Sequence, residues 1–219
     1  MISDKYKCLF VHIPKTAGTS IEKLLGHFEE LEYGVQDHRT VREIEAINLS
    51  DLVSLTNREG FIPALRDLRG LLRYPYRLTQ EELSDYFSFA FVRNPWARVH
   101  SWYRSVTRDE YFQRTRKISA DCTFDDFLIE HTWHSELRPQ LTWLKNRQGE
   151  LGVEYIAKFE NIEEEIQIIA QRLKLPSNEL PHLLKRESID YRKYYTDSSI
   201  KFVYELYAEE IEMFGYSFD

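Results

Sequence analysis

The segment Phe10–Ser20, with the sequence FVHIPKTAGTS, limits the possible folds of this chain more than any other stretch. An apolar run ends at Pro14, and beyond the next few polar residues the apolar positions return with helical spacing, at Ile21, Leu24, Leu25 and Phe28. This order predicts a strand, a tight loop and a helix. The amide groups of such a loop, together with a helix N-terminus, form a site for an anion.

Side chains of the predicted loop add donors to this anion site. We expect a phosphate-like or sulfate-like group to be held by Lys15, Thr16, Ala17, Gly18, Thr19 and Ser20. A nucleoside-triphosphate P-loop is the obvious alternative, but that motif places its lysine directly after the last glycine. Here Lys15 precedes Gly18 by three residues, and no glycine begins the loop.

A second strand–loop–helix unit follows later in the chain. Ser88–Arg93 predicts a short apolar strand, Asn94 suits a helix N-cap, and Pro95 suits the first helical position. Arg93 then lies at the carboxyl end of the strand, and Ser101 lies about two turns into the helix. Ligands of open α/β sheets bind at this edge. The two units together predict a ligand with two separated anionic groups.

The pair IPKTAGTS and FVRNPWARVHSWY resembles the 5′-phosphosulfate loop and the 3′-phosphate motif of sulfotransferases that use 3′-phosphoadenosine 5′-phosphosulfate (PAPS). The similarity is to the carbohydrate sulfotransferase group, with its heparan, chondroitin and HNK-1-type enzymes, and to soluble bacterial relatives. Leu137–Leu144, Tyr155–Glu163 and Tyr191–Phe218 also look like later segments of that group. The resemblance implies PAPS as the donor, PAP as the product, and a small-molecule or glycan acceptor that offers a hydroxyl group.

The expected fold is α/β, with a mainly parallel sheet flanked by helices in a P-loop-like sulfotransferase arrangement, and residues 1–219 are expected to form a single domain. The pattern predicts strands over 7–13, 87–93 and 153–159, a short strand near 33–37, and a strand or turn around 141–145. Helices are predicted over 19–28, 95–107, 123–131, 161–174 and 198–213. Residues 41–86 have few strand signals and are expected to form helices and loops on the acceptor side.

Sulfuryl transfer requires stabilisation of the charge on the leaving oxygen and removal of the acceptor's proton. Lys15 suits the first task. His38 is the candidate base, because it lies at a predicted strand-to-helix junction and because family relatives often have their catalytic histidine after the first helix. His12 is expected to be structural or to support another residue, and a direct role for it stays open as an alternative.

The resemblance places the 3′-phosphate on Arg93 and Ser101, a charged forked donor and a neutral one. Arg192 lies in the polar, aromatic segment 188–197, which reads equally as a surface loop or as a flap with Arg192 on a phosphate. Arg98 and Arg104 are expected to lie on the surface or to pair with acidic groups.

No metal site is expected, because His131 and His134 lack an accompanying cluster of ligands. Cys8 and Cys122 are isolated, so we expect two reduced thiols. The 219 residues are 42% hydrophobic, which suffices for a core, and the formal net charge of −7 argues against nucleic-acid binding.

The first residues do not follow the pattern of a signal peptide, and no apolar run is long enough to span a bilayer. We therefore expect a cytoplasmic enzyme, with a trimmed Golgi-luminal domain as the less favoured alternative. Two other functions stay open. One is a P-loop-type phosphotransferase or nucleotide kinase, which would need Mg²⁺ ligands, and the other is a non-catalytic PAP-binding protein.

Overall fold

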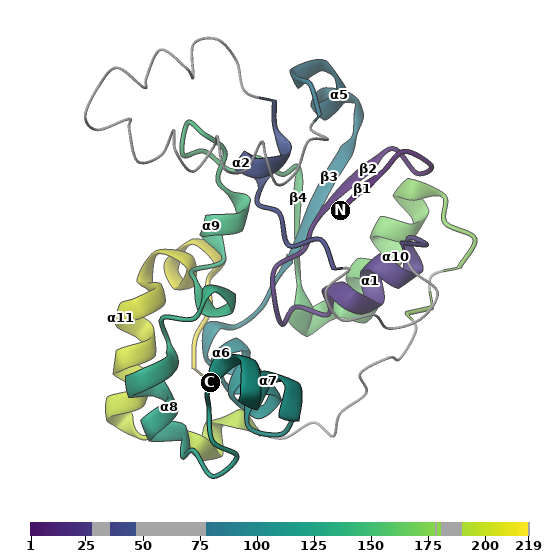
Figure 1. Cartoon of the computed structure of the whole chain (residues 1–219). Helices are drawn as coiled ribbons and strands as arrows, with labels where there is room; N and C mark the ends of the chain where they lie inside the picture. Colours follow the sequence, from purple (N-terminus) through teal and green to yellow (C-terminus); the bar gives the residue numbers. More distant parts are fainter. Residues whose placement is uncertain (28–35, 47–77, 178, 181–189, 219) are drawn as a thin grey trace.

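The computed structural model describes residues 1–27, 36–46, 78–177, 179–180 and 190–218. Within these residues, four strands form one sheet in the order β1-β2-β3-β4 (Figure 1): β1 (Ile2–Ser3), β2 (Cys8–Val11), β3 (Phe87–Val92) and β4 (Tyr155–Lys158). β2, β3 and β4 run parallel, whereas β1 pairs antiparallel with β2. The predicted α/β fold with a mainly parallel sheet is confirmed; the antiparallel strand β1 was not predicted.

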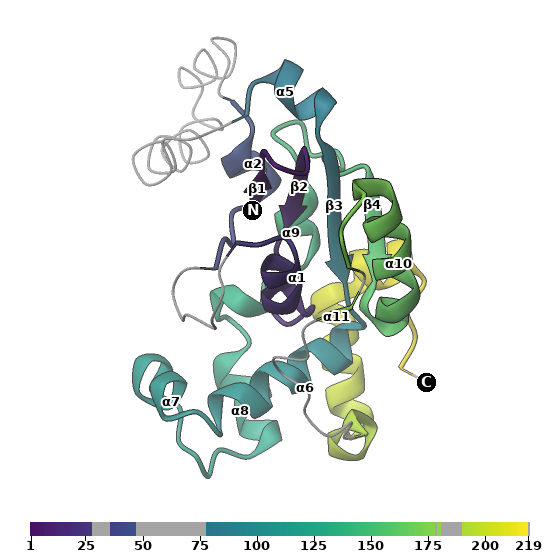
Figure 2. The ribbon, with the colours of Figure 1, turned by 90° about the vertical axis from the view of Figure 1, so that its right-hand side faces the viewer.

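Both faces of the sheet are covered, as the continuous apolar character of β2 and β3 requires. On one face, Phe10 pairs in register with Phe89, and the core there includes residues of α1 (Gly18–Leu24) and α10 (Ile162–Leu173). On the other face, the core includes residues of α2 (Val41–Ile44) and α9 (Leu141–Leu144). Figure 1 shows α9 and α1 on opposite sides of the strands, and in Figure 2 the side that carries α1 and α10 faces the viewer.

A separate apolar cluster joins three helices beyond the carboxyl ends of the strands: α6 (Pro95–Val106), α8 (Phe124–His131) and α11 (Asp197–Phe214). Figure 1 shows α6 leading away from the end of β3, with α7 (Glu110–Arg116) and α8 beside it. The loop that follows β2 and the first turns of α6 are therefore brought to the same edge of the sheet.

The predicted helix starts are partly confirmed. The Asn94 side chain accepts hydrogen bonds from the amides of Trp96 and Ala97, and Thr123 caps α8 through the amide of Asp126. The helix predicted over 161–174 begins without a side-chain cap. A short 3-10 helix, η3 (Phe159–Asn161), leads directly into α10, and the Asn161 side chain makes no capping hydrogen bond.

Several predicted elements differ from the structure. Residues 141–144 form the helix α9, and only Lys145 pairs in an isolated bridge, with Leu151. The strand predicted near 33–37 falls largely outside the described residues. Of the helical pieces predicted within 41–86, α2 and α5 (Gln80–Asp85) are described. Two further short 3-10 helices are η2 (Ser135–Leu137) and η4 (Tyr191–Tyr194).

Candidate active site

The loop between β2 and α1 has an unusual backbone. Lys15 and Ala17 have φ angles of 73° and 65°, in the left-handed region that side chains other than glycine rarely adopt. The Thr16 hydroxyl donates to the carbonyl of Ile13 at 2.8 Å, so it supports the turn itself. The amides of Gly18 and Thr19 lie in the first turn of α1, where no intrahelical acceptor exists. These amides can therefore meet an anion.

Gly18 is required by a side chain, not by its backbone angles. The ring of His12 lies against it, and a Cβ at this position would come under 3.0 Å from the imidazole. His12 itself is almost completely buried. The glycine that begins α1 therefore makes room for a histidine that directly follows β2.

Lys15 reaches from the loop to α6. Its Nζ donates to the Ser105 hydroxyl at 2.7 Å, and that hydroxyl donates in turn to the carbonyl of Ser101 at 3.0 Å. The lysine charge is thus held between the loop and the helix that follows β3. An ammonium in this position is available to an anion bound by the loop amides.

Arg93 lies at the end of β3 and contacts the same loop. Its Nη1 donates to the carbonyl of Lys15 at 3.1 Å, and its guanidinium carbon lies 4.3 Å from the centre of the Phe159 ring. Burial lowers the pKa of Arg93 to about 10, with the nearby Glu160 carboxylate acting in the opposite direction. The guanidinium remains charged at neutral pH, and its Nε has no partner among the described residues.

The backbone of Arg93 is fixed by a residue that gave no signal in the sequence. The side-chain amide of Gln140 accepts from the Arg93 amide and donates to the Arg93 carbonyl, both at 2.8 Å. Gln140 is fully buried and also donates to the carboxylate of Glu210 on α11. The end of β3 is therefore tied to α11 through one glutamine.

One face of α6 is turned toward the loop. Arg98 donates to the carbonyl of Pro14 at 3.2 Å, and Ser105 accepts from Lys15. Ser101 lies three residues after Arg98 and four before Ser105, so it shares their face of the helix. It is partly exposed. The structure thus brings Ser101 to the side of α6 on which Lys15 lies.

The prediction that Arg98 lies on the surface is wrong. Its side chain is fully buried, and within the described parts of the chain it donates only to backbone carbonyls, those of Pro14, Glu136 and Arg138. A guanidinium can satisfy several orphan carbonyls at once, which offsets part of its desolvation cost. Arg104 is partly buried, with its Nε inaccessible to solvent.

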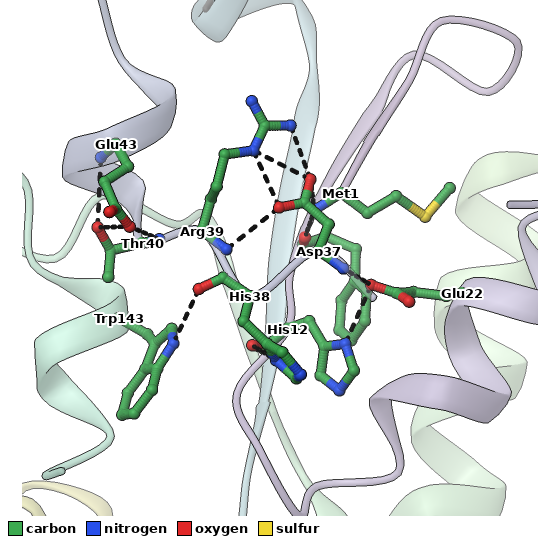
Figure 3. Close-up of polar contacts among 10 residues, drawn as sticks. Met1, His12, Glu22, Asp37, His38, Arg39, Thr40, Glu43 and Trp143 are labelled. Atoms are coloured by element: carbon green, nitrogen blue, oxygen red, sulfur yellow. Dashed lines mark hydrogen bonds and ion pairs between the residues drawn. The ribbon is translucent and has the colours of Figure 1, made fainter. Parts of the chain in front are cut away.

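His38 lies close to His12, as Figure 3 shows. The ring centroids are 4.1 Å apart, and His38 Nδ1 lies 3.2 Å from the carbonyl oxygen of His12. Because a carbonyl only accepts, we assign the proton to Nδ1, which leaves the lone pair on Nε2. Trp143 donates to the His38 carbonyl at 3.2 Å. Although part of the residue is exposed, desolvation and then the charge of His12 lower the pKa of His38 to about 4.

Glu22 is a second residue that sequence reasoning missed. Its carboxylate is fully buried on α1, where Oε1 lies 3.0 Å from His12 Nδ1 and accepts from the amide of Asp37 at 3.1 Å (Figure 3). Burial alone raises the pKa of Glu22, but the hydrogen bond and charge of His12 lead the opposing contacts and hold it below its usual value. Glu22 on α1 thereby connects this helix to His12, which follows β2, and to Asp37, which precedes His38.

The model of the sulfotransferase family matches residues 1–217. The chain belongs to this family. An uncharacterized protein of Archaeoglobus fulgidus is 29% identical over 118 residues, which cover 53% of this chain and 92% of that protein. No solved structure matches the chain significantly. The family supports sulfuryl transfer as the general activity of this chain.

In this sulfotransferase, the predicted site residues fall into two groups. The structure brings Lys15, Arg93, Ser101 and the loop together at one edge of the sheet, with His38 against the His12 side of that loop. Arg192 lies in η4 and forms an ion pair with Asp190 at 2.8 Å, on an exposed side chain. Its segment stays, as predicted, either a surface loop or a flap that places Arg192 on a phosphate.

The described part of this sulfotransferase contains no group of three side chains suited to hold a metal ion. Cys8 and Cys122 are free thiols, the first buried and the second partly so. None of the helices in the described residues is both long enough and apolar enough to cross a bilayer.

Proposed function

We propose that this sulfotransferase moves the sulfuryl group of PAPS to an acceptor hydroxyl on a carbohydrate. The observation that carries the proposal is the hydrogen bond from Arg93 to the carbonyl of Lys15. It makes the two predicted anion sites neighbours, as a donor with a 5′-phosphosulfate and a 3′-phosphate requires. The carbohydrate acceptor rests on the sequence resemblance alone.

The residues of the chain fit such a donor. Arg93 has an unpartnered buried Nε, and Ser101 presents a hydroxyl on the loop-facing side of α6. Both suit the 3′-phosphate. The first amides of α1 and the ammonium of Lys15 suit the 5′-phosphosulfate, where they would stabilise the negative charge that builds on the leaving phosphate oxygen.

His38 is the proposed general base. With Nδ1 directed at the His12 carbonyl, the lone pair on Nε2 is available to take the acceptor's proton. Lys15 and His38 would thus serve opposite sides of the transferred group. The transfer is an in-line displacement at sulfur. The acceptor oxygen attacks sulfur, the bond from sulfur to the phosphate oxygen breaks, and PAP leaves with the electron pair.

Two assays test the proposal directly. The first compares thermal unfolding of the protein with PAP, with ATP and Mg²⁺, and without ligand. Stabilisation by PAP supports the proposal, whereas stabilisation by ATP and Mg²⁺ alone would favour a phosphotransferase. The second supplies radiolabelled PAPS with a panel of glycans and follows transfer of label, and PAP binding without any transfer would favour a non-catalytic nucleotide-binding protein.

Replacing Arg93 with alanine should weaken PAP binding by about 2–5 kcal/mol, because a buried charged donor would be lost from the 3′-phosphate. Adenosine 5′-phosphosulfate lacks that phosphate, so its affinity should change little. Isothermal titration calorimetry with both ligands measures the difference. Equal losses for the two ligands would show that Arg93 only supports the Lys15 loop.

The pH dependence of kcat/KM should show an ascending limb near pH 4. The base must be neutral to accept a proton, and the pKa of His38 in the free protein is lowered from 6.5 to about 4. Activity should therefore be lost only as the pH falls through that value, because kcat/KM reports the free enzyme. A limb near the ordinary histidine pKa would mean that another group, or a different His38 environment, controls the reaction.

A further inference from the structure

His100 is a buried histidine that the proposed mechanism does not use. It precedes Ser101 on α6 and is 3% exposed. Aromatic rings enclose it on several sides, with centroids at 4.4 Å for Tyr194, 5.7 Å for Phe124 and 6.2 Å for Tyr103. Its Nε2 is inaccessible and has no hydrogen-bond partner among the described residues. A buried polar nitrogen without a partner is costly and calls for an explanation.

The charges that act on His100 are all positive. Arg104 follows it by four residues on α6, Arg108 lies just beyond the end of that helix, and Arg93 comes from the end of β3. The contacts from α8 and η4 are the aromatic rings of Phe124 and Tyr194. An imidazole nitrogen without a partner, acted on by positive charges alone, is suited to an anion that supplies both the missing hydrogen-bond partner and the missing negative charge.

His134 shows that burial alone does not create this arrangement. It is also 3% exposed, and its Nε2 also has no partner among the described residues. However, the charges acting on it are mixed, with the Glu136 carboxylate first, followed by Arg116 and His131. His134 therefore serves as a matched control: a buried histidine with an orphan nitrogen and no arginine cluster.

We propose that His100 is a further ligand of the 3′-phosphate, which it contacts through Nε2, and that it takes up a proton when the phosphate binds. This inference rests on the proposed function, since it needs a donor nucleotide with a 3′-phosphate. It adds a titrating ligand to Arg93 and Ser101, so that the same subsite senses pH as well as phosphate.

The electrostatics give the direction of the effect. Burial, followed by Arg104, Arg93 and Arg108, lowers the pKa of His100 to about 4, so the free protein holds it neutral at pH 7. A phosphate dianion beside the ring opposes the arginine charges and favours the imidazolium, which raises the pKa in the complex. Binding must then take up a proton at pH values between the two pKa values, and the affinity must rise as the pH falls through the upper one.

Calorimetry on the full chain tests the proposal without knowledge of the acceptor. PAP is titrated at about pH 6 in buffers of different ionisation enthalpy, so that the heat reports the protons exchanged. The wild type, His100→Gln and His134→Gln are compared. The protons exchanged by the phosphates of PAP are a shared background, and the difference between proteins isolates the histidine. We expect less proton uptake for His100→Gln than for the wild type, and no change for His134→Gln.

A second variant tests the contact itself. His100→Phe keeps the ring packing against Tyr194 and Phe124 but has no donor, so PAP should bind about 10–100-fold more weakly. Adenosine 5′-phosphosulfate, without the 3′-phosphate, should bind within about twofold of wild type. If circular dichroism shows that His100→Phe does not fold, the proton uptake of His100→Gln alone tests the proposal.

The outcomes separate this inference from the proposed function. If the wild type binds PAP, but His100→Gln takes up as many protons and His100→Phe binds as tightly, His100 is not a ligand and the proposed function stands. If both ligands weaken equally in His100→Phe, the effect is structural and the inference is wrong. If the wild type does not bind PAP, the proposed function fails, and this inference fails with it.

Discussion

Gly18→Ala should lower the free energy of unfolding by about 3–5 kcal/mol, the cost of breaking a buried ion pair. The new Cβ would lie under 3.0 Å from the ring of His12. That ring is held by Glu22 and stacks on Phe10 with centroids 5.7 Å apart, so it cannot move aside without losing these contacts. Alanine ordinarily stabilises a helix relative to glycine, so the sign of the effect is diagnostic. Urea unfolding, followed by circular dichroism, measures it.

The control is a double-mutant cycle with His12→Ala. Removing the imidazole frees the space that the Cβ would occupy, so Gly18→Ala should cost little in the His12→Ala background. Additive losses in the double mutant would show that Gly18 is needed for another reason, such as its own backbone.

His38→Ala should lower turnover by about 10²–10⁴, the usual contribution of a general base. PAP affinity should stay near that of wild type, because the proposed contact of His38 is with the acceptor's proton. The measurement is steady-state transfer from labelled PAPS to an active acceptor, with PAP affinity determined by calorimetry on the same samples. His131→Ala, on α8, is a matched control that should retain activity.

Lys15→Ala provides the contrast. Because Lys15 is proposed to contact the donor, its loss should lower turnover and PAPS affinity together. If His38→Ala keeps most of its activity, the base is elsewhere, and His12 becomes the next candidate because its ring lies 4.1 Å away.

The elements that the sequence predicted well are those set by local patterns. β2, β3 and the start of α6 follow from apolar runs and from the Asn94–Pro95 pair, whose preferences act within a few residues. One wrong element also has a local cause. Residues 141–144 are short and apolar, a pattern shared by strands and buried helices, and here they form α9.

The supporting residues of the site could not be predicted, because their roles depend on distant contacts. Glu22 reads as an ordinary helical glutamate until β2 brings His12 to it. Gln140 gains its role only when the end of β3 lies 2.8 Å from its amide, 47 positions away in the sequence. Arg98 looked like a surface residue because charge favours exposure, and only the folded chain supplies the carbonyls that satisfy it. Sequence patterns and the family resemblance thus identified the side chains proposed to contact the ligand. They did not identify the residues that fix the positions of those side chains.

The contacts of Arg98 also bear on how freely this sulfotransferase can change during evolution. Among the residues that the structure describes, every acceptor of its guanidinium is a main-chain oxygen, on the loop at Pro14 and on the segment that carries Glu136 and Arg138. A main-chain acceptor persists whatever side chain is attached to it. The side chains at 136 and 138 can therefore diverge without loosening the donor loop, provided that the backbone keeps its course. These contacts therefore constrain the residue type mainly at position 98, where a lysine would lack the forked geometry of the guanidinium.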